Sequence, residues 1–369
     1  MWYTKTMNPD ISSKNSPYLE VDLSKIRSNA HTITQLCESR GLSVVGVTKG
    51  VSGIPQVAQA MLDGGVCALA DARIRNIDRM RKGGINAEIM MLRLPRISSS
   101  AEVVRKADDS MNSELHIIRS LLEESRRISK PHGIIYMVDV GDLREGVLFS
   151  RALDDVAHIL KLDGITFRGI GTNVGCFGGV MPSPENMSLL AQTARRIRLR
   201  YGAAFDVVTV GGTNCLKMVA QGAMPPEISH IRIGEGILLG RDSSRNALLE
   251  GTWQDAFRLA AEIVEIKEKP SVPIGRIGRD AFGNTPVFIN RGVRRRALIS
   301  LGKQDVRQSG LIPEDKDIKV LGGSSDYYIL DISDCKREYA LGDSVWFQLS
   351  YPGLLSATTS QYMSVYFRD

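Results

Sequence analysis

The sequence predicts an α/β protein in which an N-terminal (β/α)8 barrel of the TIM type precedes a C-terminal all-β domain. Between residue 18 and about residue 240, short apolar runs alternate with amphipathic stretches. The apolar runs are nearly continuous, as in parallel strands that are buried on both faces. After about residue 250, short alternating runs are separated by Pro and Gly, which is typical of an all-β domain. A doubly wound open sheet is the alternative for the first part.

The expected elements follow in chain order. Residues 1–17 read as a polar tail, residues 18–245 as the barrel and residues 246–369 as the β domain. A first helix starts near Asp22 or Ser24 and ends at Gly41, because Ile26, Ala30 and Ile33 share one face. Further helical patterns cover residues 55–65 and 188–202. The expected barrel strands lie within residues 43–49, 66–72, 88–95, 113–118, 133–141, 165–175, 205–212 and 230–240, and the pattern at 113–118 is the weakest.

Composition narrows the class of protein. The chain has 369 residues, of which 43% are hydrophobic and 24% are charged, and this is typical of a globular protein large enough for two domains. No apolar run approaches the roughly 18 residues of a membrane span, and the N-terminus has no apolar core of the signal-peptide type. We therefore expect a cytoplasmic protein without a membrane partner.

Cysteine and charge patterns also exclude several functions. The five cysteines are scattered, without the ligand spacing of a zinc site, so neither a disulfide framework nor a metal site is predicted. The net charge is +6, yet basic residues are dispersed among 41 acidic ones. Nucleic-acid binding is therefore not expected.

Polar residues at the ends of the predicted strands indicate an active site. In a barrel, the C-terminal ends of the strands carry the active-site face. Lys49 ends the first strand, and a Gly-Gly-Thr-Asn turn at 211–214 ends the seventh. Backbone N–H groups of such a turn can bind an anion. A lysine beside a phosphate site suggests a Schiff base with pyridoxal phosphate or with a sugar-phosphate aldehyde.

Several motifs give the chain a family resemblance. They are VTKG with Lys49, DVGDLREGV at 139–147, RGIGTNVGCFGG at 168–179, RIGEGILLG at 232–240, EKPSVPIGRIGRDAFGNTP at 268–286 and GGSSDYYILDIS at 322–333. In this order and spacing, the chain resembles the fold-type III pyridoxal-phosphate enzymes of the alanine racemase superfamily. It is most similar to the branch of ornithine racemase-like enzymes.

The resemblance implies a role for each matching residue. Lys49 would carry pyridoxal 5'-phosphate as a Schiff base and then act as a base on one face of the substrate Cα. Arg144 would lie near the cofactor's phenolic oxygen and the substrate carboxylate, and Arg232 would face the pyridine nitrogen. Asn173 would lie beside the ring. The phosphate would be held by a further set of residues, namely Gly212, Thr213, Asn214, Gly234 and Tyr362.

Racemisation also needs an acid/base on the opposite face of the Cα. In this superfamily it comes from the β domain of the partner subunit, so the resemblance implies a homodimer with shared active sites. The superfamily's tyrosine motif is absent here, where GRIGRDAFGN contains Phe282 instead. Tyr327 is the best candidate and Tyr328 the second, with Ser325 and Asp326 as substrate-binding neighbours.

The function implied is a pyridoxal-phosphate-dependent amino-acid racemase. Ornithine or lysine would need a carboxylate near the distal amine, and Asp142, Glu145, Glu235 and Asp280 are all available. Three alternatives stay open: a decarboxylase or aldolase on the same cofactor, a non-catalytic binder of pyridoxal phosphate, and a class I-type sugar-phosphate aldolase.

Overall fold

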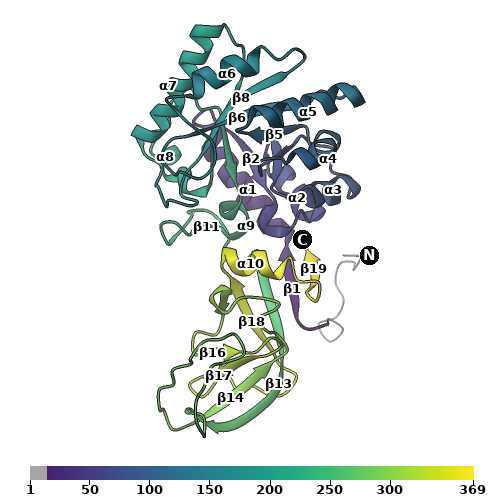
Figure 1. Cartoon of the computed structure of the whole chain (residues 1–369). Helices are drawn as coiled ribbons and strands as arrows, with labels where there is room; N and C mark the ends of the chain where they lie inside the picture. Colours follow the sequence, from purple (N-terminus) through teal and green to yellow (C-terminus); the bar gives the residue numbers. More distant parts are fainter. Residues whose placement is uncertain (1–14) are drawn as a thin grey trace. The chain divides into compact units, whose positions relative to one another are not determined.

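The computed structural model describes residues 15–369 and divides the chain into two compact units. The first is Leu23–Gln254. The second is Asp255–Asp369 together with the described residues up to Asp22. Each unit is described by itself below, and Figure 1 shows their helices and strands in sequence colours.

The first unit is a closed barrel of parallel strands. Neighbouring strands pair in chain order, and the ring closes because β10 pairs with β2. The barrel strands are β2 (Ser43–Val47), β3 (Ala68–Asp71), β4 (Ile89–Met91), β5 (Asp109–Asn112), β6 (Gly133–Asp139), β8 (Thr166–Asn173), β9 (Val207–Gly211) and β10 (His230–Ile233). A doubly wound sheet would leave two open edges, so the predicted barrel is confirmed and the open sheet is wrong.

The barrel is filled by apolar side chains from alternate strand positions. Val45, Met90, Met111 and Met137 belong to one buried cluster. Because bulky side chains fill the interior, the barrel is a packed core and its polar residues gather at the strand ends.

Helices surround the barrel (Figure 1). The first, α1 (Leu23–Glu38), buries Ile26, Ala30, Ile33 and Cys37 as predicted. The others are α2 (Pro55–Asp63), α3 (Ile74–Lys82), α4 (Ser100–Lys106), α5 (Leu115–Ile128), α6 (Ala152–Leu160), α7 (Pro184–Tyr201), α8 (Leu216–Ala220) and α9 (Glu235–Leu239), with single 3-10 turns η2 (Lys49–Val51), η3 (Ile97–Ser99) and η4 (Thr213–Cys215) and short strands β7 (Val147–Leu148), β11 (Arg241–Asp242) and β12 (Ala247–Leu248).

The strand predicted at 113–118 is wrong. That segment begins α5, and the strand is the preceding β5, whose sequence is DSMN. Its Ser110 and Asn112 are buried and hydrogen-bonded within the fold, although Asn112 Oδ1 has no partner among the described residues. Ser110 Oγ lies 2.7 Å from His132 Nε2, and Asn112 Nδ2 donates to the Ser110 carbonyl at 2.8 Å.

The second unit is a mostly antiparallel sheet in the order β15-β18-β13-β14-β17-β16. It contains β13 (Phe257–Pro270), β14 (Val293–Ile299), η5 (Gln308–Gly310), β15 (Leu311–Pro313), β16 (Lys319–Gly323), β17 (Tyr328–Asp331), β18 (Ser344–Leu349), α10 (Tyr351–Ala357) and β19 (Ser364–Arg368). The strand β1 (Tyr18–Asp22) joins it, antiparallel to β13 and parallel to β19. An all-β C-terminal domain is thus confirmed, while residues 18–22 lie in its sheet although they precede the barrel in the chain.

Two sequence-based expectations, on membrane spans and on the polar tail, can be compared with the structure. No helix among them is both long and apolar enough to cross a bilayer. Most of the predicted polar tail, residues 1–14, lies outside the described residues.

Candidate active site

Lys49 stands at the C-terminal mouth of the barrel. It follows β2 after Thr48 and opens the 3-10 turn η2. The side chain remains accessible to solvent, yet the surrounding protein lowers the pKa of its amine. Desolvation is the largest cause, and the positive charges of Arg144 and Arg232 add to it. The amine is therefore more easily deprotonated than an ordinary lysine amine.

A buried carboxylate holds the strand end that carries Lys49. Asp71, at the end of β3, accepts from Thr48 Oγ1 at 2.7 Å and from the N–H of Arg73 and Nδ2 of Asn76 at 2.9 Å. Burial raises the pKa of Asp71, although these hydrogen bonds oppose the rise. Asp71 therefore holds the side chain of Thr48, the residue before Lys49, and both of its carboxylate oxygens accept hydrogen bonds.

Arg232 crosses the mouth from β10 and is almost fully buried. Its guanidinium donates to Thr209 Oγ1 at 2.7 Å, to the Thr172 carbonyl at 2.6 Å and to Asn173 Oδ1 at 2.7 Å. Desolvation lowers its pKa to about 10. Arg232 is therefore a cation at neutral pH, and its bonds hold the ends of β8 and β9 in place.

Arg144 lies in the loop that follows β6 and forms a two-point ion pair with its neighbour. Its Nη2 donates to Glu145 Oε1 at 2.6 Å, and its Nε donates to Oε2 of the same carboxylate. Glu145 Oε1 also accepts from Nδ2 of Asn173. Arg144 therefore lies at the barrel mouth and also forms a salt bridge within its own loop.

The loops after β6 and β8 are tied together by Asp142. Its buried carboxylate accepts the N–H groups of Gly175 at 3.1 Å, Phe177 at 2.9 Å and Val180 at 3.3 Å. Asp142 is therefore already engaged by backbone donors, which makes it a structural anchor and a poor ligand for a substrate amine.

The Gly-Gly-Thr-Asn turn leads from β9 into η4. Within residues 15–369, the backbone N–H groups of Thr213 and Asn214 have no acceptor. A Cβ placed on Gly212 would lie 3.9 Å from Asn214 Oδ1 and 4.0 Å from the Arg232 carbonyl, so one further atom fits beside the turn in ordinary contact. The two side chains are engaged elsewhere, since Thr213 Oγ1 accepts from the Gly236 N–H and Asn214 Nδ2 donates to the Val174 carbonyl. The turn offers N–H groups to a ligand, and Gly234 precedes α9 beside it.

The remaining predicted residues belong to the second unit. Tyr327 is 46% exposed, whereas Tyr328 is fully buried and donates its hydroxyl to the Val306 carbonyl at 2.7 Å. Ser325 Oγ donates to Asp326 at 2.6 Å, and both residues are exposed. Tyr362 is exposed and accepts a hydrogen bond from Gln361.

Sequence reasoning missed how Glu145 is used. The sequence indicates it only as one of four carboxylates available to a distal amine. The structure shows that it joins Arg144 to Asn173, which is 28 positions away in the chain. No spacing rule could have found this bond, because it depends on two loops that meet only in the closed barrel.

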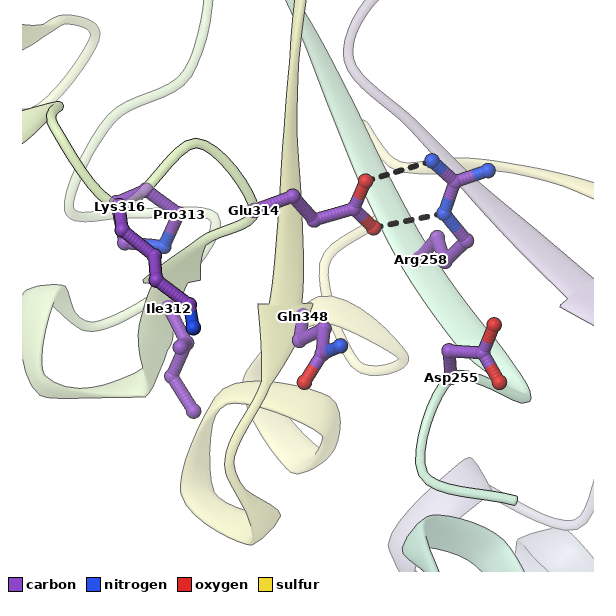
Figure 2. Close-up of a pocket in the computed structure, with 7 residues that line it drawn as sticks. All are labelled: Asp255, Arg258, Ile312, Pro313, Glu314, Lys316 and Gln348. Carbon is purple, nitrogen blue, oxygen red and sulfur yellow. Dashed lines mark hydrogen bonds and ion pairs between the residues drawn. The ribbon is translucent and has the colours of Figure 1, made fainter.

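A pocket of about 430 Å³ lies in the second unit, and none of the predicted site residues lines it. Figure 2 shows its charged wall, where Arg258 donates from Nε and Nη2 to the two carboxylate oxygens of Glu314 at 2.7 and 2.6 Å. Among the residues described here, no group of three His, Cys, Asp or Glu side chains could hold a metal ion.

Comparisons with known proteins cover nearly the whole chain. A family model described as the N-terminal domain of alanine racemase matches residues 21–242. The chain is 40% identical over 347 residues to a lysine racemase of Thermotoga maritima, covering 94% of this chain and 97% of that relative. It is 37% identical over 348 residues to an ornithine racemase of Acetoanaerobium sticklandii, covering 94% and 98%.

Solved structures share the architecture at lower identity. An alanine racemase of Clostridium difficile 630 superposes with a TM-score of 0.75 at 17% identity and covers 96% of both chains. A D-threonine aldolase from Filomicrobium marinum gives a TM-score of 0.73 at 15% identity, covering 94% of this chain and 89% of that one. These two likenesses establish the fold. The family model and the two full-length relatives show that the chain belongs to the alanine racemase family and is an amino-acid racemase.

Proposed function

We propose that the protein is a homodimeric racemase of basic amino acids that uses pyridoxal 5'-phosphate. Lys49 and Tyr327 are its two proton-transferring groups, and each active site takes Tyr327 from the partner subunit. The observation that carries this proposal is Lys49, an amine of lowered pKa at the barrel mouth among Arg144 and Arg232.

The residues at the mouth suit an anionic aldehyde such as this cofactor. In the described part of the chain the N–H groups of Thr213 and Asn214 lack acceptors, and a further atom fits at Gly212, as a phosphate site requires. The Thr172 hydroxyl is buried without a partner at the end of β8. We therefore assign the phosphate to residues 212–214 and Gly234, with the exposed hydroxyl of Tyr362 as a further donor.

Pyridoxal phosphate would supply an electron-accepting ring that acidifies the Cα–H bond of an attached amino acid. The protein's own task is then to move two protons. Lys49 accepts the Cα proton on one face, and Tyr327 delivers a proton on the other, with the roles exchanged for the opposite enantiomer. The lowered pKa of Lys49 favours the neutral amine that this role needs.

Two arginines would orient the reacting groups. Arg144 donates Nε and Nη2 to Glu145, and the remaining N–H groups of its planar guanidinium suit a substrate carboxylate. Arg232 remains protonated at neutral pH and would face the cofactor's ring nitrogen. Because a cation there would disfavour protonation of that nitrogen, Arg232 would limit electron withdrawal by the ring. That restraint favours proton transfer over side reactions.

A second copy of the chain would complete each site. Tyr327 is exposed in the second unit, and the segment 271–292 of the same unit leaves Ile274 94% exposed and Val287 90% exposed. Exposed apolar side chains in one segment indicate a surface that another protein covers. We propose that the partner subunit covers it, so that Tyr327 and Ser325 reach the partner's barrel.

Basic substrates are proposed from the two full-length relatives, which are named for lysine and ornithine. A distal ammonium needs a carboxylate that is accessible and not already paired with a cation. Asp142 is held by backbone N–H groups and Glu145 by Arg144, whereas Asp326 is exposed beside Tyr327 and accepts from two neutral groups, Ser325 Oγ and Gln304 Nε2. We therefore assign the distal ammonium to Asp326. All five cysteines are free, which agrees with action in the reducing cytoplasm.

Proton exchange tests this proposal. The purified protein is loaded with pyridoxal phosphate and incubated in D2O with L- and D-forms of lysine, ornithine, arginine and alanine. NMR follows Cα deuteration, and chiral chromatography follows the enantiomer ratio. Inversion with deuterium incorporation, fastest for lysine or ornithine, is expected, and Lys49→Ala should abolish it. Exchange with retention, or release of CO2 or an aldehyde, would overturn the racemase with two bases in favour of another reaction on the same cofactor.

A further inference from the structure

Glu145 occupies a central position among the charged groups of the barrel mouth. Its side chain is only 17% exposed, although it lies in a loop. It receives the Nε and Nη2 groups of Arg144 and the side-chain amide of Asn173. One carboxylate thus connects the loop after β6 with the end of β8.

The bond to Asn173 also decides how that amide is oriented. Asn173 Nδ2 donates to Glu145, while its Oδ1 accepts from Arg232 Nη2 at 2.7 Å. A flipped amide would point its NH2 group at the Arg232 guanidinium and its oxygen at the Glu145 carboxylate. Both contacts would be repulsive, so Glu145 and Arg232 together allow one orientation.

Glu145 also offsets positive charge at the mouth. Lys49, Arg144 and Arg232 repel one another, since Arg144 lowers the pKa of both other groups. Without a carboxylate beside it, the Arg144 side chain would be free to move away from the two cations. The Glu145 carboxylate also accepts from Asn173 on β8, which distinguishes this contact from an isolated ion pair between neighbours in one loop.

We propose that Glu145 is a positioning residue, whose carboxylate fixes the Arg144 fork and the Asn173 amide in the geometry that the reaction uses. This inference rests on the proposed function, in which Arg144 meets the substrate carboxylate and Asn173 meets the cofactor ring. Glu145 itself acts only through these two residues.

The test compares Glu145→Gln with Glu124→Gln. Glu124 forms a comparable ion pair with Arg127, at 2.6 Å. Both residues belong to the helix α5 and not to the loops that follow the strands. Both variants lose a carboxylate that binds an arginine. For Glu145→Gln we expect kcat for racemisation to fall about 10- to 100-fold, because a displaced orienting group costs rate more than stability. Glu124→Gln should leave kcat unchanged.

A second readout needs no activity. In the cofactor-free protein, the pKa of the Lys49 amine is measured by NMR of 15N-labelled lysine, with Lys49→Ala identifying the signal. Removal of the Glu145 charge leaves Arg144 uncompensated, so the Lys49 pKa should fall further in Glu145→Gln, on the order of half a unit. Glu124→Gln should not move it.

The outcomes separate the two proposals. If Glu145→Gln keeps both kcat and the Lys49 pKa, or loses kcat only in proportion to a lowered melting temperature, the positioning role is wrong. Glu145→Asp provides the check if the glutamine variant unfolds, because it keeps the charge but shortens the reach. In Glu145→Asp the pKa of Lys49 should stay close to its wild-type value, while kcat should fall. An unchanged kcat would also overturn the positioning role. If the wild-type protein does not racemise any amino acid, the proposed function fails, while the Lys49 pKa still tests Glu145.

Discussion

Tyr327 and Tyr328 are neighbours in sequence but opposite in environment. Tyr328 is fully buried and donates to the Val306 carbonyl at 2.7 Å, whereas Tyr327 is 46% exposed just before β17 begins. Alternation along the strand forces this difference. Only Tyr327 can therefore offer its hydroxyl to a molecule outside the second unit.

Tyr327→Phe should stop inversion while leaving the fold intact. Removal of a general acid/base typically costs a factor of about 10²–10⁴ in rate. Lys49 remains, so the enantiomer that presents its Cα–H to Lys49 should still exchange that hydrogen with D2O. NMR of Cα deuteration, run separately on each enantiomer, measures this. Equal loss of exchange for both enantiomers would contradict the assignment of Tyr327 to the opposite face.

Tyr328→Phe should lower the stability of the protein and leave inversion nearly unchanged. The change removes the hydroxyl that satisfies the Val306 carbonyl in a buried setting, which costs about 1–2 kcal/mol of unfolding free energy. Catalysis should be nearly unchanged at a temperature where the protein is folded. Denaturant unfolding of this variant beside Tyr327→Phe measures the difference, and a large loss of kcat without a loss of stability would exclude the structural role.

Most of the fold followed from patterns that depend on burial alone. The strand Gly133–Asp139 is apolar up to its last residue because both faces are covered, and the sequence shows this directly. The strand Asp109–Asn112 could not be found in the same way. Its buried Ser110 is bonded to His132, from the segment before the next strand, and its Oγ also accepts from Asn112 Nδ2. A pattern of single residues carries no information about such partners.

The candidate site shows the same limit. Lys49, Arg232 and the 211–214 turn could be predicted, because each sits at the end of a recognisable strand. The bridging contacts of Asp142 and Glu145 could not, because they join loops that are distant in sequence. The pairing of Tyr18–Asp22 with Ser364–Arg368 is also a contact between the two ends of the chain, which local patterning does not reveal.

The amine of Lys49 should titrate below its ordinary value of 10.5. Desolvation and the nearby arginines disfavour the ammonium form, so the neutral amine is available at lower pH than for an exposed lysine. In the cofactor-free protein, the rate of labelling by trinitrobenzene sulfonate, followed at this site by peptide mass spectrometry, should reach half of its maximum below that pH. Lys316 and other exposed lysines serve as internal references. A Lys49 midpoint equal to theirs would contradict the desolvated site.

Asp142→Asn should destabilise the loop after β8. Burial raises the pKa of Asp142, but the N–H groups of Phe177, Val180 and Cys176 lower it more, and the net pKa lies below its ordinary range. The carboxylate therefore contributes stability above the unfolded-state pKa of about 3.9. That contribution is lost as the pH falls through the lower folded-state pKa.

The measurement for Asp142 is unfolding free energy as a function of pH. At pH 7 we expect Asp142→Asn to cost about 1–3 kcal/mol, because hydrogen bonds to a charged acceptor are lost. The difference in unfolding free energy between Asp142→Asn and the wild type should disappear in strong acid. Asp163→Asn is the control, since that side chain is fully exposed. A gap that stays constant with pH would mean that the charge of Asp142 has no part in holding the loop.

Subunit mixing tests whether the active sites are shared. Lys49→Ala and Tyr327→Phe should each be inactive in inversion when alone. If Tyr327 serves the partner's barrel, a mixed dimer contains one site with both defects and one site with neither. Random mixing makes half of the dimers mixed, so about a quarter of all sites should recover activity. The two variants are unfolded together, refolded and assayed, with each variant refolded alone as the control. If Tyr327 instead serves the barrel of its own chain, each site in a mixed dimer carries one defect and no activity returns, because neither proton-transferring group can act for both faces of the Cα.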